Sequence, residues 1–65
     1  MSASKNLVLS NDENELSCWI NDKNNLYIEV GEINSEFPYQ KGYITLDIDD
    51  VLELIKELKS LVKQM

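Results

Sequence analysis

The apolar residues in the last third of the chain recur with the period of an α-helix. Advancing by about 100° per residue from Ile48, they fill one arc of about 180°, and polar residues fill the other half except for Lys59 at one margin. The stretch contains no Gly or Pro and is rich in Leu, Glu and Lys, which are good helix formers. This pattern predicts a helix over about 48–64. Its apolar arc comprises Ile48, Val51, Leu52, Leu54, Ile55, Leu58, Leu61, Val62 and Met65.

Charged residues are arranged along this segment as they are in stable helices. Asp47 stands at the N-cap position, where a carboxylate accepts hydrogen bonds from free backbone N–H groups. Asp49 and Asp50 fall in the first turn and lysines follow later, which is the order that the helix dipole favours. We expect the helix to follow directly on a strand over about 43–47.

Two earlier stretches, about 15–20 and 26–31, alternate between apolar and polar residues with the period of a β-strand. The loop 21–25 between them is rich in Asn and Asp, which tolerate left-handed backbone conformations. These features predict a β-hairpin. If opposed residues share a face, the register pairs Ile20 with Leu26, Cys18 with Ile28, Leu16 with Val30 and Trp19 with Tyr27.

The remaining segments are shorter or irregular. A strand is predicted over about 5–10, followed by a polar turn. Gly31 is expected to end the second hairpin strand or to form a bulge. The stretch 32–42 contains Pro38, which cannot donate to a strand ladder, and is predicted to be a loop. Phe37 and Tyr39 in this loop are candidate partner contacts, and the alternative is a lid over one end of the core.

Together these elements predict a single small α+β domain over residues 1–65. Three strands, or four with the N-terminal one, form an antiparallel β-meander, and the C-terminal amphipathic helix packs on one face (β-β-β-β-α). The face expected to take the helix carries Leu16, Cys18, Ile20, Leu26, Ile28, Val30, Ile44 and Leu46.

The opposite face of the predicted sheet carries Trp19, Tyr27 and Tyr43. A solvated sheet face carries mostly polar residues, and Trp and Tyr are enriched at binding hot spots. We therefore take these aromatic residues, with Phe37 and Tyr39, as candidate contacts for a protein partner. The alternative is that the rings only stabilise cross-strand pairs.

The apolar arc of the helix is wider than the roughly 100° that a helix on one sheet requires. Leu54, Leu58, Leu61 and Met65 are therefore candidate self-association residues, and we expect a homo-oligomer, most simply a dimer. The alternative is a helix set deeply in its own domain. A chain of 65 residues with one cysteine and no histidine can form no internal disulfide and lacks the commonest transition-metal ligand, which leaves oligomerisation as the usual means of stabilising so small a core.

The composition excludes most catalytic chemistry. Without histidine, Ser–His–Asp and Cys–His arrangements cannot form. Both glycines are isolated, so there is no phosphate-binding loop, and Cys18 is expected to be an inert thiol facing the core. We expect a non-enzymatic protein with no metal and no cofactor. No apolar run is long enough for a signal peptide or a membrane span, so we expect a cytoplasmic protein without membrane association.

Twelve acidic residues against six lysines give a net charge of −6 at pH 7. Direct nucleic-acid binding is not expected, because phosphate contacts come mainly from Lys and Arg. The acidic surface could instead mimic nucleic acid, or could only keep the protein soluble. The absence of Arg beside abundant Asn, Lys and Ile suggests AT-rich coding DNA, such as that of a low-GC bacterium, its phage or a mobile element. The acidic surface residues are Asp12, Glu13, Glu29, Glu32, Glu36, Asp49 and Asp50.

The function expected from these observations is that of a small acidic protein-binding module, which acts as an inhibitor or regulatory protein on a protein partner of unknown identity. One alternative is a nucleic-acid mimic that blocks the DNA or RNA site of an enzyme. A second alternative is an oligomer that binds a small ligand between stacked aromatic rings.

Overall fold

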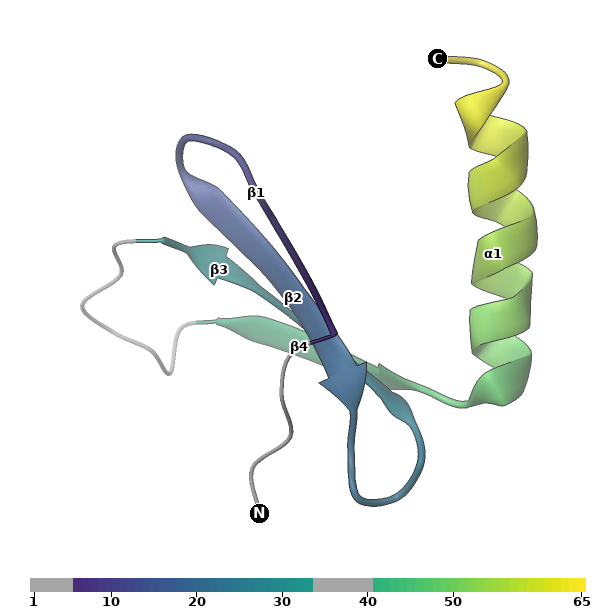
Figure 1. Ribbon diagram of the computed structural model, residues 1–65, viewed down its shortest axis with the longest axis horizontal. Coiled ribbons are helices and arrows are strands. Elements are labelled where there is room, and N and C mark those ends of the chain that lie inside the picture. Colours follow the sequence, from purple (N-terminus) through teal and green to yellow (C-terminus); the bar gives the residue numbers. More distant parts are fainter. Residues whose placement is uncertain (1–5, 34–40) are drawn as a thin grey trace.

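The computed structural model describes residues 6–33 and 41–65. Within these ranges, four strands form one antiparallel sheet in the order β1-β2-β3-β4, and a helix follows (Figure 1). This is the predicted α+β class, a meander with a C-terminal helix. The elements are β1 (Leu7–Ser10), β2 (Asn14–Ile20), β3 (Leu26–Glu32), β4 (Gly42–Leu46) and α1 (Ile48–Val62).

Asparagine side chains stabilise the connections between the first three strands. Between β2 and β3, Asn21 Oδ1 accepts hydrogen bonds from the backbone N–H groups of Lys23 and Asn25, both at 3.0 Å. Asn24 in the same turn has φ 62°, a left-handed conformation that Asn adopts more readily than most residues. Asn11 accepts two backbone hydrogen bonds in the same way between β1 and β2. Hydrogen bonds from backbone N–H groups to an Asn side chain therefore stabilise both turns.

The predicted register of β2 on β3 is confirmed, since Ile20 pairs with Leu26, Cys18 with Ile28, Leu16 with Val30 and Trp19 with Tyr27. On the far side of β3, Ile44 lies opposite Ile28 and Leu46 opposite Leu26. β1 adds Leu7 opposite Cys18 and Leu9 opposite Leu16. Because opposed residues share a face, one side of the sheet is apolar across all of these strands.

The prediction that Gly31 ends its strand or forms a bulge is wrong. Gly31 lies inside β3, paired with Glu15. A Cβ atom built on Gly31 would lie 2.5 Å from Cγ of Lys41, so the Lys41 side chain crosses the strand where a larger residue would block it. Close approach of a neighbouring side chain explains this glycine.

A single residue, Asp47, joins β4 to α1. Its carboxylate accepts a hydrogen bond from the backbone N–H of Asp50 at 2.9 Å, and its backbone is extended, with φ −80° and ψ 178°. The predicted N-cap is thereby confirmed. So short a link, fixed by a cap, sets the direction in which α1 leaves the sheet.

The helix stands beside the sheet (Figure 1), and its contacts with the sheet centre on β4, the strand that it follows. The apolar side of α1 faces the predicted sheet face, but a cavity remains between the helix and the sheet. Within residues 6–33 and 41–65 no hydrophobic side chain is buried, and the buried residue there is Ser17, at 2% exposure. The apolar surfaces that the sequence assigns to a core are therefore only partly covered.

Candidate interaction surfaces

Three aromatic side chains from successive strands form a row across the sheet face opposite α1. The rings of Trp19 and Tyr27 have centroids 4.6 Å apart, and those of Tyr27 and Tyr43 are stacked at 5.4 Å with an interplanar angle of 14°. Trp19 lies directly opposite Tyr27, whereas Tyr43 lies opposite Glu29 and reaches Tyr27 diagonally. We call Trp19, Tyr27 and Tyr43 the aromatic row.

The three residues of the aromatic row differ in their exposure. Trp19 and Tyr27 are half-buried, whereas Tyr43 is 69% exposed. Burial of the phenol, the Glu29 carboxylate and Tyr43 raise the pKa of Tyr27 above its usual 10.0, because each of the three disfavours the charged form. The neutral phenol offers both a donor and an acceptor beside the ring.

Polar side chains cover the part of the sheet face that lies beside the aromatic row. The stem of Lys41 crosses Gly31, and its Nζ lies 3.6 Å from Glu29 Oε1. Ser17, which is buried, has Val8 and Glu29 as its cross-strand neighbours. This face is therefore a packed surface with the row at one side of it, rather than a set of separate solvated side chains.

The other sheet face and α1 together line an open cavity of about 380 Å³, which we call the apolar cleft. The sheet contributes Leu7, Leu9, Leu16, Cys18, Leu26 and Ile28. The helix contributes Val51, Leu54, Ile55 and Leu58. None of these described lining residues is charged, so the cleft offers apolar contact and a thiol but no ionic group for a ligand.

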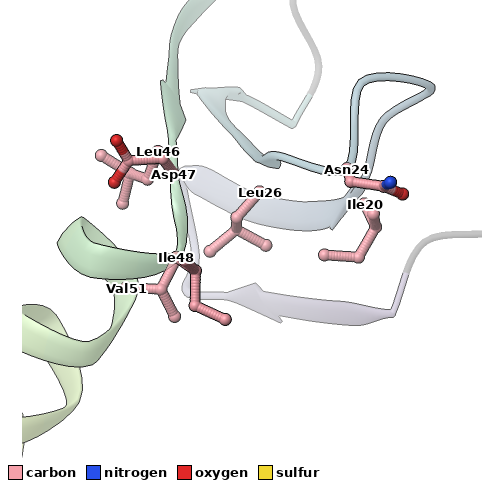
Figure 2. A pocket seen from close by; sticks show the side chains of 7 residues that line it. All are labelled: Ile20, Asn24, Leu26, Leu46, Asp47, Ile48 and Val51. Atoms are coloured by element: carbon pink, nitrogen blue, oxygen red, sulfur yellow. The ribbon is translucent and has the colours of Figure 1, made fainter.

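A smaller cavity of about 140 Å³ lies at the corner where β4 turns into α1. Figure 2 shows Leu26 between the side chains of Ile20 and Asn24 and those of Ile48 and Val51. Leu26 and Val51 also line the apolar cleft, so both cavities result from the same incomplete contact between helix and sheet. Asp47, the carboxylate at this corner, is engaged as the helix cap.

The predicted self-association residues fall in two places. Leu54 and Leu58 line the apolar cleft. Leu61 and Met65 lie beyond it along α1 and its C-terminal end, with 43% and 99% of their surfaces exposed. Sequence reasoning did not place Leu7 and Leu9 in this surface, because their alternation with Val8 left the register of β1 open.

The predicted acidic surface is divided between the two ends of the sheet. Asp12 and Glu13 lie in the turn before β2 and Glu32 ends β3, whereas Asp49 and Asp50 begin α1. Glu29 is paired with Lys41. The structure therefore does not gather these carboxylates into one strip. Glu36 lies outside the described residues, as do the candidate contacts Phe37 and Tyr39.

In the part of the chain that the structure describes, no helix has the length and apolar content needed to cross a membrane. No group of three or more His, Cys, Asp or Glu side chains in the same ranges is arranged to hold a metal ion.

Compared with known proteins, the chain matches no family model, no curated protein and no solved structure.

Proposed function

We propose that this protein is a small acidic binding module without enzymatic activity, which regulates or inhibits a protein partner by contacting it through the aromatic row. The observation that carries the proposal is the continuous ring surface of Trp19, Tyr27 and Tyr43, with Tyr43 at its exposed end. Aromatic side chains provide a large contact area at a small cost in conformational entropy, which is why they dominate binding hot spots.

The geometry supports a protein partner better than the two alternatives. Nucleic-acid mimicry relies on an array of carboxylates, and here the acidic residues are divided between the ends of the sheet. A small ligand held between stacked rings needs a gap between them, whereas the neighbouring rings of the row contact one another, with centroids 4.6 and 5.4 Å apart. A row of rings flanked by an ion pair between Lys41 and Glu29 resembles the centre and rim of a protein interface.

A photo-crosslinking amino acid placed at position 43 tests this proposal in cells of the source organism. Position 43 lies in the aromatic row, and position 60, on the polar side of α1, provides a matched control because Ser60 is also exposed. We expect an adduct between the position-43 variant and a different protein, identified by mass spectrometry, and no adduct from position 60. The complex should persist at about 0.5 M salt, where exposed charges are strongly screened.

Three results would count against the proposal. The first is no adduct at position 43, and the second is an equal yield at position 60. The third is a complex that loses most of its affinity as salt is added, which is the behaviour of a nucleic-acid mimic.

A further inference from the structure

We propose that α1 of a second copy of this chain completes the apolar cleft, so that the protein is a two-fold dimer whose paired helices each cover the sheet of the other copy. This surface is separate from the aromatic row, so the inference stands independently of the function proposed above. Its starting point is that Leu7 and Leu9 of the sheet and Leu54, Ile55 and Leu58 of α1 all face the cleft while between 37% and 56% exposed.

The described apolar side chains around the cleft leave a large surface exposed. On the sheet, Leu7, Leu9 and Ile44 are 45%, 56% and 54% exposed. On α1, the exposed apolar residues are between 37% and 65% exposed, and they are Leu52, Leu54, Ile55, Leu58, Leu61 and Val62. A stable interface buries about 800 Å² on each partner, and these side chains of sheet and helix are the surface that would supply it.

The chain itself supplies an occupant of the right shape. The helix α1 has 15 residues, or about 22 Å at 1.5 Å per residue, and the 7-residue strands β2 and β3 extend for about 23 Å. The apolar side of α1 continues past the cleft through Leu61 and Val62, which are 43% and 65% exposed. A helix from a second copy can therefore cover the sheet along its full length and bury its own exposed apolar side in doing so.

The helix of the same chain is held away from this position. Asp47 is the whole connection between β4 and α1, and its carboxylate fixes the first turn through the N–H of Asp50. Swinging α1 onto its own sheet would require a change in the backbone at Asp47, the residue whose extended conformation and cap set the first turn. A second copy fills the cleft without that change.

The charges on α1 favour an antiparallel pair of helices. The first half carries Asp49, Asp50 and Glu53, and the second half carries Lys56 and Lys59, with Glu57 as its single acidic residue and Lys63 following at the C-cap. A two-fold axis across the pair sets the acidic half of one helix beside the basic half of the other. Parallel helices would place like charges together, which is unfavourable. Isologous contact of this kind is the commonest symmetry of soluble oligomers.

Light scattering on the full chain and on two charge-matched variants tests the dimer. Leu58→Glu places a carboxylate in the cleft, and Ser60→Glu places the same charge on the polar side of α1. We expect the wild-type chain and Ser60→Glu to have twice the mass of one chain, and Leu58→Glu to dissociate about 100-fold more readily, because a charge buried in an apolar interface is strongly unfavourable. A monomeric wild-type protein, or a Leu58→Glu dimer as stable as the Ser60→Glu dimer, would overturn the proposal.

A cross-linking experiment identifies the occupant of the cleft even if Leu58→Glu fails to fold. Cys18 is the only cysteine and lines the cleft from β2, facing the helix residues that include Leu58. In Leu58→Cys, mild oxidation with diamide should join Cys18 of one copy to position 58 of the other and give a covalent dimer on a non-reducing gel. A disulfide within one chain would show that α1 closes on its own sheet, and two unreacted thiols would show that no helix covers Cys18. Either result excludes the proposed arrangement.

Discussion

At the scale of single residues, the two glycines of the chain differ in the space that is available for a side chain. Gly31 lies beneath the Lys41 side chain, whereas a Cβ atom on Gly42 would meet only the carbonyl oxygen of Val30, at 4.0 Å. An added methyl group must therefore displace Lys41 from Gly31 and disturb its ion pair with Glu29. At Gly42 the same methyl group meets ordinary van der Waals space.

We expect Gly31→Ala to lower the free energy of unfolding by about 1 kcal/mol, the usual cost of forcing a close contact apart. Gly42→Ala should leave it unchanged or raise it by up to about 1 kcal/mol, because alanine reduces the entropy of the unfolded chain. Urea denaturation followed by circular dichroism measures both values at one protein concentration. Equal effects of the two substitutions would contradict the role assigned to Lys41.

At the scale of elements, the aromatic row links β2, β3 and β4, and this arrangement changes the pKa of the Tyr27 phenol. The pKa of Tyr27 is raised above 10.0 by partial burial, by Glu29 and by Tyr43. As the pH rises past about 10, the unfolded chain loses this proton before the folded protein does. The contribution of Tyr27 to stability is therefore constant below pH 10 and falls between pH 10 and its folded-state pKa.

A difference titration isolates this group. Tyrosinate absorbance of the wild type minus that of Tyr27→Phe should give a midpoint above pH 10, and Glu29→Gln should shift that midpoint toward 10, since it removes one of the causes. The loss of stability on going from pH 9 to pH 11 should also be smaller in Tyr27→Phe. A difference midpoint at or below 10 would contradict the packing of the row.

The elements and the register of β2 on β3 were predictable from the sequence, because local signals determine them. Alternation in β2 and β3 set which residues share a face, the Asn-rich turn limited how the strands could pair, and Asp47 marked the start of α1. The same alternation placed Trp19, Tyr27 and Tyr43 on one face before their distances were known. Gly31 was misread because its reason is a contact with Lys41, a residue ten positions away that no local pattern reveals.

The distance between α1 and the sheet was not predictable in this way. The apolar period of α1 shows which side of the helix avoids water, but not which surface covers it. That depends on the one-residue link at Asp47 and on its cap, which set the path of α1 away from β4. The sequence therefore allowed a helix set deeply in its own domain and a helix shared with a second copy, and the open apolar cleft favours the second.

At the scale of the whole molecule, the described residues of one chain form no closed core. Hydrophobic burial is the main favourable contribution to folding, and a domain of this size is marginal even when its core is complete. If the apolar surface of α1 and the sheet is buried only between two copies, folding and association are one equilibrium. The stability of such a protein depends on its concentration.

The most direct test is the melting temperature of the wild-type chain at two protein concentrations that differ by about 100-fold. For a dimer that unfolds to two chains, this dilution costs about 2.7 kcal/mol per dimer, or about 1.4 kcal/mol per chain, and a domain of this length shifts by about 4–8 °C per kcal/mol. We predict that the melting temperature rises by roughly 5–10 °C from the dilute to the concentrated sample. A melting temperature that stays the same at both concentrations would show that one chain folds alone, and would contradict the proposed completion of the apolar cleft by a second copy.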